Sequence, residues 1–586
     1  MTLTSRTWGP TPMPDGRVRF RLWAPAEKVV TLLADGRELE MRTESDGWHE
    51  IETESARAGT SYAFRLADGR EIADPASHAQ QDGVEGPSLV VDHDRYVWQH
   101  PDWAGRPWQE AVIYELHIGT FTPEGTFEAA IACLPHLRDI GITAIEIMPV
   151  AHFAGQRGWG YDGVLHYAPH NAYGAPDRLK ALVDAAHGHG MMVLLDVVYN
   201  HFGPVGNALP RLAPRFFHPE RHTPWGAAIA FEEEAVRRYF IENALHWIVD
   251  YRFDGLRLDA TEEIEDEADR HVLIEMAETV RQAVPHRQVH LVVEDQWSRK
   301  GLLNRDGGVA RHYTAGWNDE FHHALHALTT GEDQGYYAPF VKDPDGILRK
   351  AIASGFVHAD RAKDRIGAPP QDPLPPDVNV NFLQNHDQIG NRAFGERLSH
   401  LVDPALLDVM TALLLLTPPV PLLFMGEEYG ERRPFLFFAD FEGELARAIF
   451  EGRRAEAEKG GGLPRQETTP PDPNDAETFR QSKLDWARAA APEGWRHADF
   501  IRRLIGLRQA HIVPLLKGPV PAEPHILPAA AGTLAVDWRF SHATLAVRAQ
   551  LTAKDQILPD APGNTIFALS ATNPAGPAIT VALTRP

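Results

Sequence analysis

Gly255-Leu256-Arg257-Leu258-Asp259 has the pattern of a buried strand that ends in a carboxylate. Residues two apart in a strand point to the same face, so Arg257 and Asp259 would face the axis of a barrel and the two leucines its helices. The same combination of an apolar run and a terminal carboxylate occurs again in residues 193–196, 291–294 and 381–387. Such segments in series predict an α/β protein with a parallel (β/α)8 TIM barrel, whose strand-end carboxylates meet at one mouth.

The surrounding sequence supplies the rest of this barrel. From about residue 105, apolar strands alternate with amphipathic helices, which is typical of a parallel sheet. The catalytic barrel would span 105–512, with inserted loops at 200–231, over the mouth, and at 440–485, over the barrel surface. Elements expected within it include a strand at 112–121, helices at 127–140 and 232–251, and a closing helix near 498–509.

Two β-domains flank the barrel in this prediction. Residues 1–104 contain short alternating strands, such as Arg17–Trp23, separated by Asp-Gly turns, which predicts an N-terminal, immunoglobulin-like β-sandwich. Residues 513–586 contain short apolar runs broken by Pro and Gly, which predicts a small C-terminal β-domain. The sandwich could bind glucan, but we favour a role in packing against the barrel.

The composition argues against several classes of function. The 586 residues carry a formal net charge of −24, which disfavours a nucleic-acid or anionic-membrane surface. Cys133 is the only cysteine, so no intramolecular disulfide can form, and the N-terminus shows no apolar signal-peptide core. We therefore expect a cytoplasmic monomer that acts on a neutral ligand. The sequence has no glycine-rich nucleotide motif, no HExxH and no GxSxG.

The strand-end carboxylates suit the cleavage of glycosidic bonds. Arg257 would keep the adjacent Asp259 ionised, as a nucleophile requires. Glu294, at the end of the next strand, would lie close to Asp259, whose negative charge should raise its pKa toward that of a general acid. Asp387 would reach in from strand seven. A lone strand-end aspartate such as Asp196 is more often a helix cap or ion-pair partner, but the joint occurrence favours a site for an oxocarbenium-like transition state.

These motifs resemble those of the α-amylase superfamily, whose members act on α-glucosidic bonds with retention of configuration. The similar segments are Asp196–His201, Gly255–Asp259, Val293–Asp295, Asn385–Asp387, Trp159–Asp162 and, in the predicted sandwich, Phe20–Pro25. The resemblance covers most of residues 1–540 and implies the same barrel, preceded by a sandwich.

The resemblance also implies a role for each matching residue. Asp259 would be the nucleophile and Glu294 the acid/base, while Asp387 would hold sugar hydroxyls and stabilise the transition state. Arg257 would orient Asp259, and Asp196 would support Arg257. The residues expected to contact the same sugar are Tyr161, by stacking, and His201 and His386, by hydrogen bonds. The chemistry is carried by carboxylates, so we expect no metal and no cofactor.

Further segments resemble the malto-oligosyltrehalose trehalohydrolase family, which cuts the α-1,4 bond next to a terminal α,α-trehalose and releases trehalose. They are Phe382–Ala393, Gly316–His323, Leu423–Tyr429 and Ser482–Trp486. Where many amylases have Lys-His after the nucleophile, this chain has Ala260-Thr261-Glu262-Glu263, which implies a different leaving-group side. The candidates for that side are Trp317, Asp319 and Glu320, although a helix cap with packing around it explains these residues equally well.

Other functions fit parts of the same pattern. A branching transferase would share the barrel and the sandwich but pass the dextrin to a glucan hydroxyl instead of water. A debranching hydrolase would act on α-1,6 bonds. A non-catalytic glucan-binding protein is disfavoured, because Asp259, Glu294 and Asp387 are all present. The products formed from malto-oligosyltrehalose and from amylose would separate these alternatives.

Overall fold

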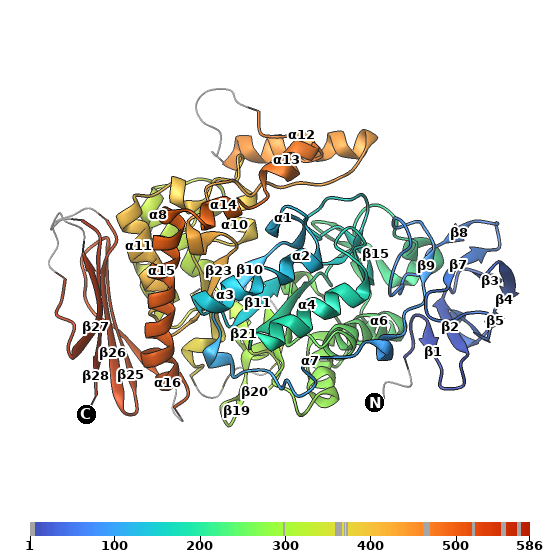
Figure 1. The fold of residues 1–586 in the computed structure, drawn as a ribbon, viewed down its shortest axis with the longest axis horizontal. Coiled ribbons are helices and arrows are strands. Elements are labelled where there is room, and N and C mark those ends of the chain that lie inside the picture. The colour runs from blue at the N-terminus through green and yellow to red at the C-terminus, as the bar shows by residue number, and fades with distance from the viewer. Residues whose placement is uncertain are drawn as a thin grey trace.

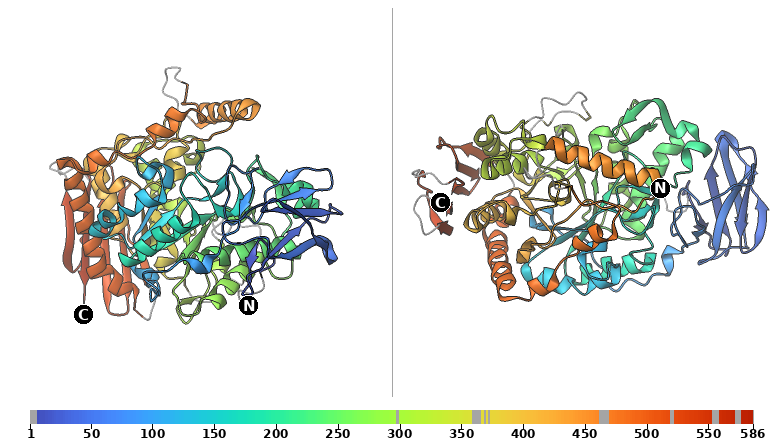
Figure 2. Two further views of the ribbon diagram at one scale, coloured as in Figure 1. Left: turned by 45° about the vertical axis from the view of Figure 1, so that its right-hand side comes forward. Right: turned by 90° about the horizontal axis from the view of Figure 1, so that it is seen from above.

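The computed structural model places a closed barrel between two regions of β-sheet (Figure 1). Two further views show the N-terminal strands at one end, the C-terminal sheet at the other, and helix α12 (Gly443–Gly460) across one side of the barrel (Figure 2). In the part of the chain that the structure describes, no helix is both long and apolar enough to cross a membrane. The described residues are 6–296, 299–357, 366–367, 370, 373–460, 469–518, 522–552, 558–570 and 576–585.

The barrel is built from parallel strands in sequence order, with the last strand paired to the first. Its strands are β10 (Ile113–Leu116), β11 (Ala144–Ile147), β14 (Met192–Val197), β17 (Gly255–Leu258), β18 (His290–Val293), β21 (Ala315–Trp317), β22 (Asn379–Phe382) and β23 (Val420–Phe424). This arrangement confirms the predicted (β/α)8 fold.

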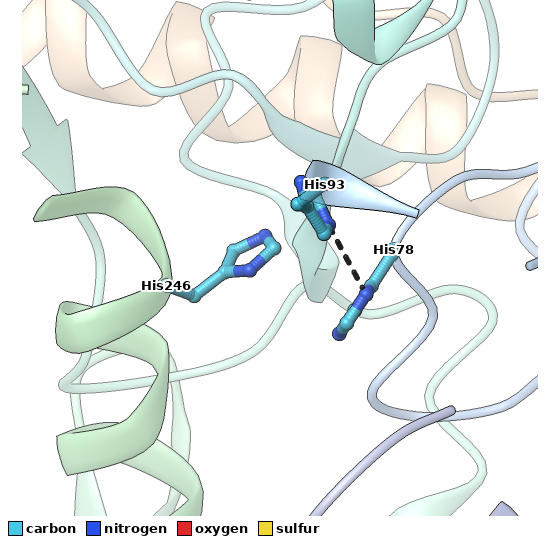
Figure 3. A group of neighbouring side chains, drawn as sticks. All are labelled: His78, His93 and His246. Atoms are coloured by element: carbon cyan, nitrogen blue, oxygen red, sulfur yellow. Dashed lines mark hydrogen bonds between the residues drawn. The ribbon is translucent and has the colours of Figure 1, made fainter. Parts of the chain in front are cut away.

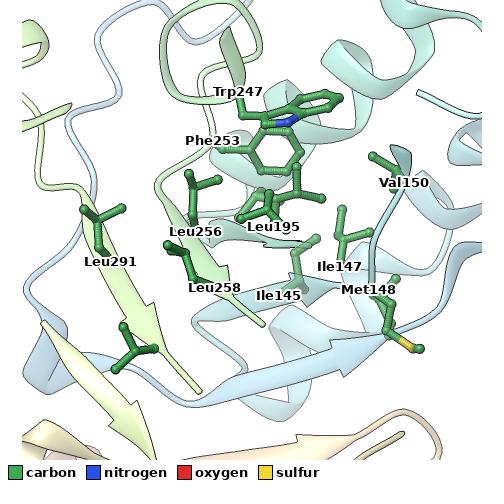
Figure 4. Close-up of a cluster of buried hydrophobic side chains, with 14 of the residues drawn as sticks. Ile145, Ile147, Met148, Val150, Leu195, Trp247, Phe253, Leu256, Leu258 and Leu291 are labelled. Atoms are coloured by element: carbon green, nitrogen blue, oxygen red, sulfur yellow. The ribbon is translucent and has the colours of Figure 1, made fainter. Parts of the chain in front are cut away.

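Alternation along the strands separates the barrel interior from its coat of helices. Leu256 and Leu258 of β17 point outward and pack in one cluster with Leu195, Leu291 and Trp247 (Figure 4). Arg257, between the two leucines, is fully buried on the opposite face. The interior carries a separate apolar cluster that includes Ile113, Ala144, Met192, Leu194, Val292, Ala315, Val380 and Leu422.

The strand register brings polar residues together at the mouth. Asp196 of β14 lies directly opposite Arg257 of β17. At Gly255, where β17 begins, a Cβ would lie only 2.0 Å from the carbonyl oxygen of His290, so this close strand spacing requires glycine. The segment Gly255–Asp259 therefore fixes both the packing of its strand and the position of its charges.

Several elements differ in extent from those predicted. Strand β10 ends at Leu116 and helix α1 (Ile118–Phe121) follows it, so the expected strand at 112–121 is too long. The expected helix at 127–140 is two helices, because Pro135 near the start of the second lacks the N–H that would continue the first. These are α2 (Phe127–Ile131) and α3 (Leu134–Ile140). The helix expected at 232–251 is α6 (Glu234–Leu245) followed by a π-helical turn, η6 (His246–Asp250).

The inserted segments contain regular structure of their own. The loop expected at 200–231 holds α5 (Leu209–Leu212) and a hairpin of β15 (Phe217–Thr223) and β16 (Gly226–Ile229). A second hairpin pairs β12 (Ala151–Phe153) with β13 (Gly163–Pro169). The remaining α-helices are α4 (Pro176–Gly188), α7 (Val272–Ala283), α8 (Asp319–Thr330), α9 (Pro344–Ala353), α10 (His386–Gly390), α11 (Pro404–Leu415), α13 (Ala476–Gln481), α14 (Trp486–Ala489), α15 (Pro492–Leu507) and α16 (Val513–Leu516).

The β-rich ends form separate sheets. The N-terminal sheets have the strand orders β1-β2-β6-β5 and β4-β3-β7-β8, with β9 on β7, and the C-terminal sheet has the order β24-β25-β26-β28-β27. Domain boundaries at residues 104 and 512 remain predictions. The N-terminal strands are β1 (Thr11–Pro12), β2 (Val18–Trp23), β3 (Val30–Ala34), β4 (Arg37–Glu40), β5 (Arg42–Thr43), β6 (Trp48–Thr53), β7 (Ser61–Leu66), β8 (Glu71–Ile72) and β9 (Ser88–Leu89). The C-terminal strands are β24 (Glu523–Ile526), β25 (Thr533–Phe540), β26 (Ala543–Gln550), β27 (Asn564–Ser570) and β28 (Ala578–Thr584).

Candidate active site

Arg257 is the centre of a cluster of carboxylates at the carboxyl ends of the barrel strands. Its Nη1 donates to both oxygens of Asp196, at 2.9 and 2.8 Å, and to Oδ1 of Asp259 at 2.9 Å. Its Nη2 forms an ion pair with Oε2 of Glu294 at 2.7 Å. The guanidinium lies over the indole of Trp317, 4.1 Å from the ring centroid. One buried cation thus holds carboxylates from β14, β17 and β18 in a fixed arrangement.

Asp259 is positioned from two sides. Arg257 holds Oδ1, and the side-chain amide of Asn200 donates to Oδ2 at 2.8 Å and to the backbone carbonyl of Asp259 at 2.8 Å. The Asp259 side chain remains 11% exposed, so a ligand can still reach it. The arrangement suits a carboxylate that must attack from a defined direction.

Glu294 is tied to the segment that follows Asp259. The backbone N–H of Ala260 donates to Oε2 of Glu294 at 3.0 Å, and Thr261 donates to the Glu294 carbonyl through its N–H at 2.9 Å and its hydroxyl at 2.6 Å. Ala260 has a φ of 37°, in the left-handed region that residues with a Cβ rarely occupy. Burial raises the pKa of Glu294, Arg257 lowers it, and Asp259 raises it. The predicted rise thus comes first from burial and only then from the neighbouring aspartate.

His386 links the mouth of the barrel to its interior. Its backbone N–H donates to Oε2 of Glu115 at 3.0 Å, and its Nδ1 bonds Oε1 of the same carboxylate. Its Nε2 bonds the hydroxyl of Tyr161 at 2.7 Å and lies 3.5 Å from Oδ1 of Asp387. Burial lowers the pKa of His386, but Glu115 and Asp387 outweigh this effect and raise it to about 9. The ring is therefore an imidazolium near neutral pH.

Tyr161 connects this imidazolium to the carboxylates around the arginine. Its hydroxyl donates to Oδ2 of Asp196 at 2.5 Å, and its ring stacks on His386 with the centroids 5.1 Å apart. Burial raises the pKa of Asp196 to about 7, although Arg257 lowers it. Asp196 therefore serves as the hydrogen-bonding link between the aromatic wall and the guanidinium.

Asp387 and Asp319 face the same space from α10 and α8. The Asp387 side chain is 38% exposed, more than that of Asp259 or Glu294, and its Oδ1 accepts from the side-chain amide of Asn391 at 3.2 Å. Burial, then Glu294 and Asp387, raise the pKa of Asp319 to about 7, which requires these carboxylates to lie close together.

The other two residues suggested for the leaving-group side lie elsewhere. Trp317 is 4% exposed and packs inside the barrel between Phe382 and the guanidinium of Arg257, so its indole is part of the floor and not of the rim. Oε2 of Glu320 accepts the backbone N–H of Val357 at 2.6 Å, which directs this carboxylate into a loop contact. Of the three candidates, the structure brings Asp319 alone up to the strand-end carboxylates.

His201 leads from the cluster into a hollow of about 630 Å³ beside the hairpin β15–β16. Its Nε2 bonds the backbone carbonyl of Tyr161 at 3.0 Å. The indole of Trp225, at the hairpin tip, stacks on the His201 ring with the centroids 4.9 Å apart and is 50% exposed. The inserted segment thus places an aromatic side chain against His201 beside this hollow.

Sequence reasoning missed three contributors to this site. Glu115 lies within β10, opposite Glu146 in register, and so does not share the strand-end position of the predicted carboxylates. Asn200 directly precedes His201, which was predicted to contact the sugar, but its amide is uncharged and gives no sign in the sequence that it would bind a carboxylate. Ala260 acts through its backbone N–H, for which the side chain gives no signal. The signal available for Glu115 was an acidic residue at the same register in two adjacent apolar strands.

Comparisons with known proteins agree with this geometry. The family model for the α-amylase catalytic domain matches residues 64–209. Malto-oligosyltrehalose trehalohydrolase from Deinococcus radiodurans is 41% identical over 507 residues, 86% of this chain and 82% of that protein. The enzyme of the same name from Saccharolobus solfataricus is 40% identical over 478 residues, 80% of this chain and 82% of that protein. A solved structure from Salmonella typhimurium, described provisionally as an α-amylase, is 48% identical, has a TM-score of 0.93, and covers 99% of this chain and 100% of its own.

The relatives extend the match well beyond the catalytic motifs. Their similarity spans most of both chains, and the barrel brings the motif carboxylates to one arginine. The chain therefore belongs to the malto-oligosyltrehalose trehalohydrolase family of α-amylase-type glycosidases.

Proposed function

We propose that this enzyme hydrolyses the α-1,4 bond next to the terminal trehalose unit of malto-oligosyltrehalose and releases α,α-trehalose with retention of configuration. The observation that carries the proposal is the pair of carboxylates, Asp259 and Glu294, held by one buried guanidinium. A fixed nucleophile beside a carboxyl whose pKa is raised by burial suits double-displacement glycoside cleavage. The names of the relatives supply the substrate.

The reaction begins with proton transfer and nucleophilic attack. Glu294 donates its proton to the bridging oxygen as a carboxylate oxygen of Asp259 attacks the anomeric carbon, and trehalose leaves. The dextrin remains as an ester on Asp259. Glu294, now ionised, takes a proton from water, whose oxygen attacks the same carbon and breaks the ester bond. Arg257 orients both carboxylates throughout.

Four further residues hold the sugar at the cleavage point in this proposal. Asp387 is more exposed than Asp259 and Glu294 and accepts hydrogen bonds from sugar hydroxyls. His386, an imidazolium, can donate to the same sugar from Nε2, whose hydrogen atom the sugar would share with the Tyr161 hydroxyl, and His201 contacts the sugar from the other side. Tyr161 presents its ring as a stacking surface, with Asp196 fixing its hydroxyl.

The trehalose side is proposed to include Asp319 and the segment after Asp259. Burial, and then Glu294, raise the pKa of Glu262 to about 8, so this glutamate lies near the proton donor. Trp317 and Glu320 would act indirectly, through Arg257 and the loop at Val357. We further propose that the enzyme works as a cytoplasmic monomer.

The decisive experiment compares two substrates of equal length, malto-oligosyltrehalose and the plain maltodextrin. We expect strong preference for the first, with free trehalose as product. The new reducing end of the dextrin should appear first as the α-anomer in the NMR spectrum, before mutarotation forms the β-anomer. New α-1,6 branches in amylose would indicate a branching transferase, and cleavage of α-1,6 bonds a debranching enzyme. Asp259→Asn should abolish activity, and substantial residual turnover would remove Asp259 from the role of nucleophile.

A further inference from the structure

Three histidines that take no part in the carboxylate cluster form a group of their own. His78 follows the N-terminal strand β8, His93 begins the turn η3 (His93–Arg95), and His246 begins η6 at the end of α6. One nitrogen from each ring lies within 4.8 Å of the others. Figure 3 shows the three rings converging, two from the N-terminal segment and one from the barrel helix. From this convergence we propose a binding site for a divalent transition-metal ion, Zn²⁺ being the best match.

The spacing of the first two ligands fits metal coordination. Nδ1 of His78 and Nε2 of His93 are 3.2 Å apart. Two nitrogens bound to Zn²⁺ at about 2.0–2.1 Å in a tetrahedron are separated by roughly 3.3 Å. An ion could therefore replace the proton shared by these rings without moving either of them far. The opposite nitrogens, Nε2 of His78 and Nδ1 of His93, are buried and have no hydrogen-bond partner.

His246 supplies the third ligand with a carboxylate behind it. Its Nδ1 bonds Oδ2 of Asp250 at 2.8 Å, one turn further along η6, and its Nε2 bonds the backbone carbonyl of Tyr167 at 2.9 Å. A carboxylate on the far nitrogen of a metal-bound histidine fixes its orientation and increases its basicity. His246 would coordinate the ion through Nε2, which would then no longer bond the backbone carbonyl of Tyr167.

The charges around the group set the protonation state of the ligands. Arg6 pairs with Asp250, and the ammonium of Lys180 donates to the backbone carbonyl of His93. Burial lowers the pKa of both His78 and His93. His246 and Arg6 lower both pKa values further, Lys180 lowers that of His93, and Asp250 raises both. A lowered pKa favours the neutral imidazole, which is the form that binds metal. Three imidazoles favour Zn²⁺, Co²⁺ or Ni²⁺ over Ca²⁺ and Mg²⁺, which prefer oxygen ligands.

A bound ion would cross-link two parts of the chain. His78 lies between β8 and β9 of an N-terminal sheet and His93 follows β9, whereas His246 lies at the end of the barrel helix α6. An ion held by all three would stabilise the folded protein by an amount that grows with the logarithm of the free ion concentration above the dissociation constant, because the unfolded chain does not bring the rings together. This role is independent of glycoside cleavage.

The test uses the full-length protein, freed of metal with a chelator and then dialysed against Zn²⁺. We expect about one tightly retained Zn²⁺ per chain and an upward shift of Tm, with no comparable shift from Mg²⁺. Co²⁺ at the same site should give the strong visible absorption of a tetrahedral complex. His78→Gln and His93→Gln should each lose the retained ion, while the exposed-histidine control His542→Gln should keep it.

Two results would overturn the proposal. One is wild-type protein that retains no ion and shows no Zn²⁺-dependent shift of Tm. The other is retention by His78→Gln and His93→Gln equal to that of the control, which would assign binding to surface histidines. Because the Tm shift is measured within each variant, a general loss of stability in a variant does not obscure the result.

Discussion

Replacing Arg257 by lysine keeps the positive charge but removes the planar guanidinium group with its several N–H donors. In the structure one guanidinium contacts Asp196, Asp259 and Glu294 through two nitrogens. An ammonium is a compact charge and cannot span carboxylates on three strands, so at least one of the contacts with Asp259 and Glu294 is lost. Each charge-assisted hydrogen bond contributes about 1.5–3 kcal/mol, which corresponds to roughly 10- to 150-fold in rate.

Loss of one or both contacts therefore predicts a fall in kcat of about 10- to 10⁴-fold. KM should change little, because Arg257 is fully buried and does not reach the ligand. The assay measures trehalose release from malto-oligosyltrehalose, with Tm recorded for the same preparations. The matched control is Arg237→Lys, at a buried arginine that pairs with Asp266 and Glu275 instead of the carboxylates around Arg257, and this variant should keep its kcat.

The reasoning is refuted if folded Arg257→Lys keeps a kcat within about threefold of the wild type. A rise in KM with unchanged kcat would also contradict it, since that pattern belongs to a residue that binds substrate and transition state equally.

Three other perturbations test separate parts of the structure. Glu115→Gln removes the main group that raises the pKa of His386 against burial, so the alkaline limb of the kcat/KM profile should move to lower pH, and an unchanged limb would exclude a need for the imidazolium. The charged form of His386 stabilises the folded state fully below the unfolded pKa of about 6.5, and this contribution is lost as pH rises through about 9. The free energy of unfolding of the wild type should therefore fall over this pH range, and in Glu115→Gln it should fall less. Asp319→Asn removes a like charge near Glu294, which should lower the pKa of this proposed proton donor and shift the same limb to lower pH, whereas a shift to higher pH would contradict the proximity. Gly255→Ala places a Cβ against the carbonyl of His290 and should lower the free energy of unfolding, measured by denaturant titration, by about 1–3 kcal/mol. A variant as stable as the wild type would show that these two strands can move apart without cost.

The barrel could be predicted from the sequence because its strands carry two independent signals. Each apolar run has the length of a buried strand, and four of them end in a carboxylate. The alternation in β17 also predicted which side chains face inward, and Arg257 and Leu256 lie on the faces expected of them.

Element boundaries were harder to predict, because local features interrupt a continuous hydrophobic pattern. The apolar periodicity of residues 127–140 runs through the break that Pro135 causes between α2 and α3. The π-helical turn η6 inserts extra backbone into a helix without changing which residues are apolar. Helix α12 lies in a segment predicted only as a surface excursion, since its charged residues suit both a solvated helix and a loop.

Within the site, the sequence revealed residue types but not their partners. The pairing of Arg257 with Asp196 follows from strand register, which no single sequence displays. Glu115 and His386 are 271 positions apart, and only closure of the barrel brings them together. The difference between Asp319, which faces the carboxylates, and Glu320, which points into a loop, depends on the direction of one helix turn.

The left-handed backbone of Ala260 restricts how this enzyme can be modified by protein engineering. Ala260 directly follows the proposed nucleophile, and its own N–H donates to Glu294. Its backbone conformation is one that glycine, asparagine and aspartate adopt most easily. A library that randomises position 260 should therefore return a narrow set of small residues, whatever substrate is used for selection. Attempts to redesign the acceptor preference have more freedom at Glu262 and Glu263, which follow the constrained residue and leave its amide in place.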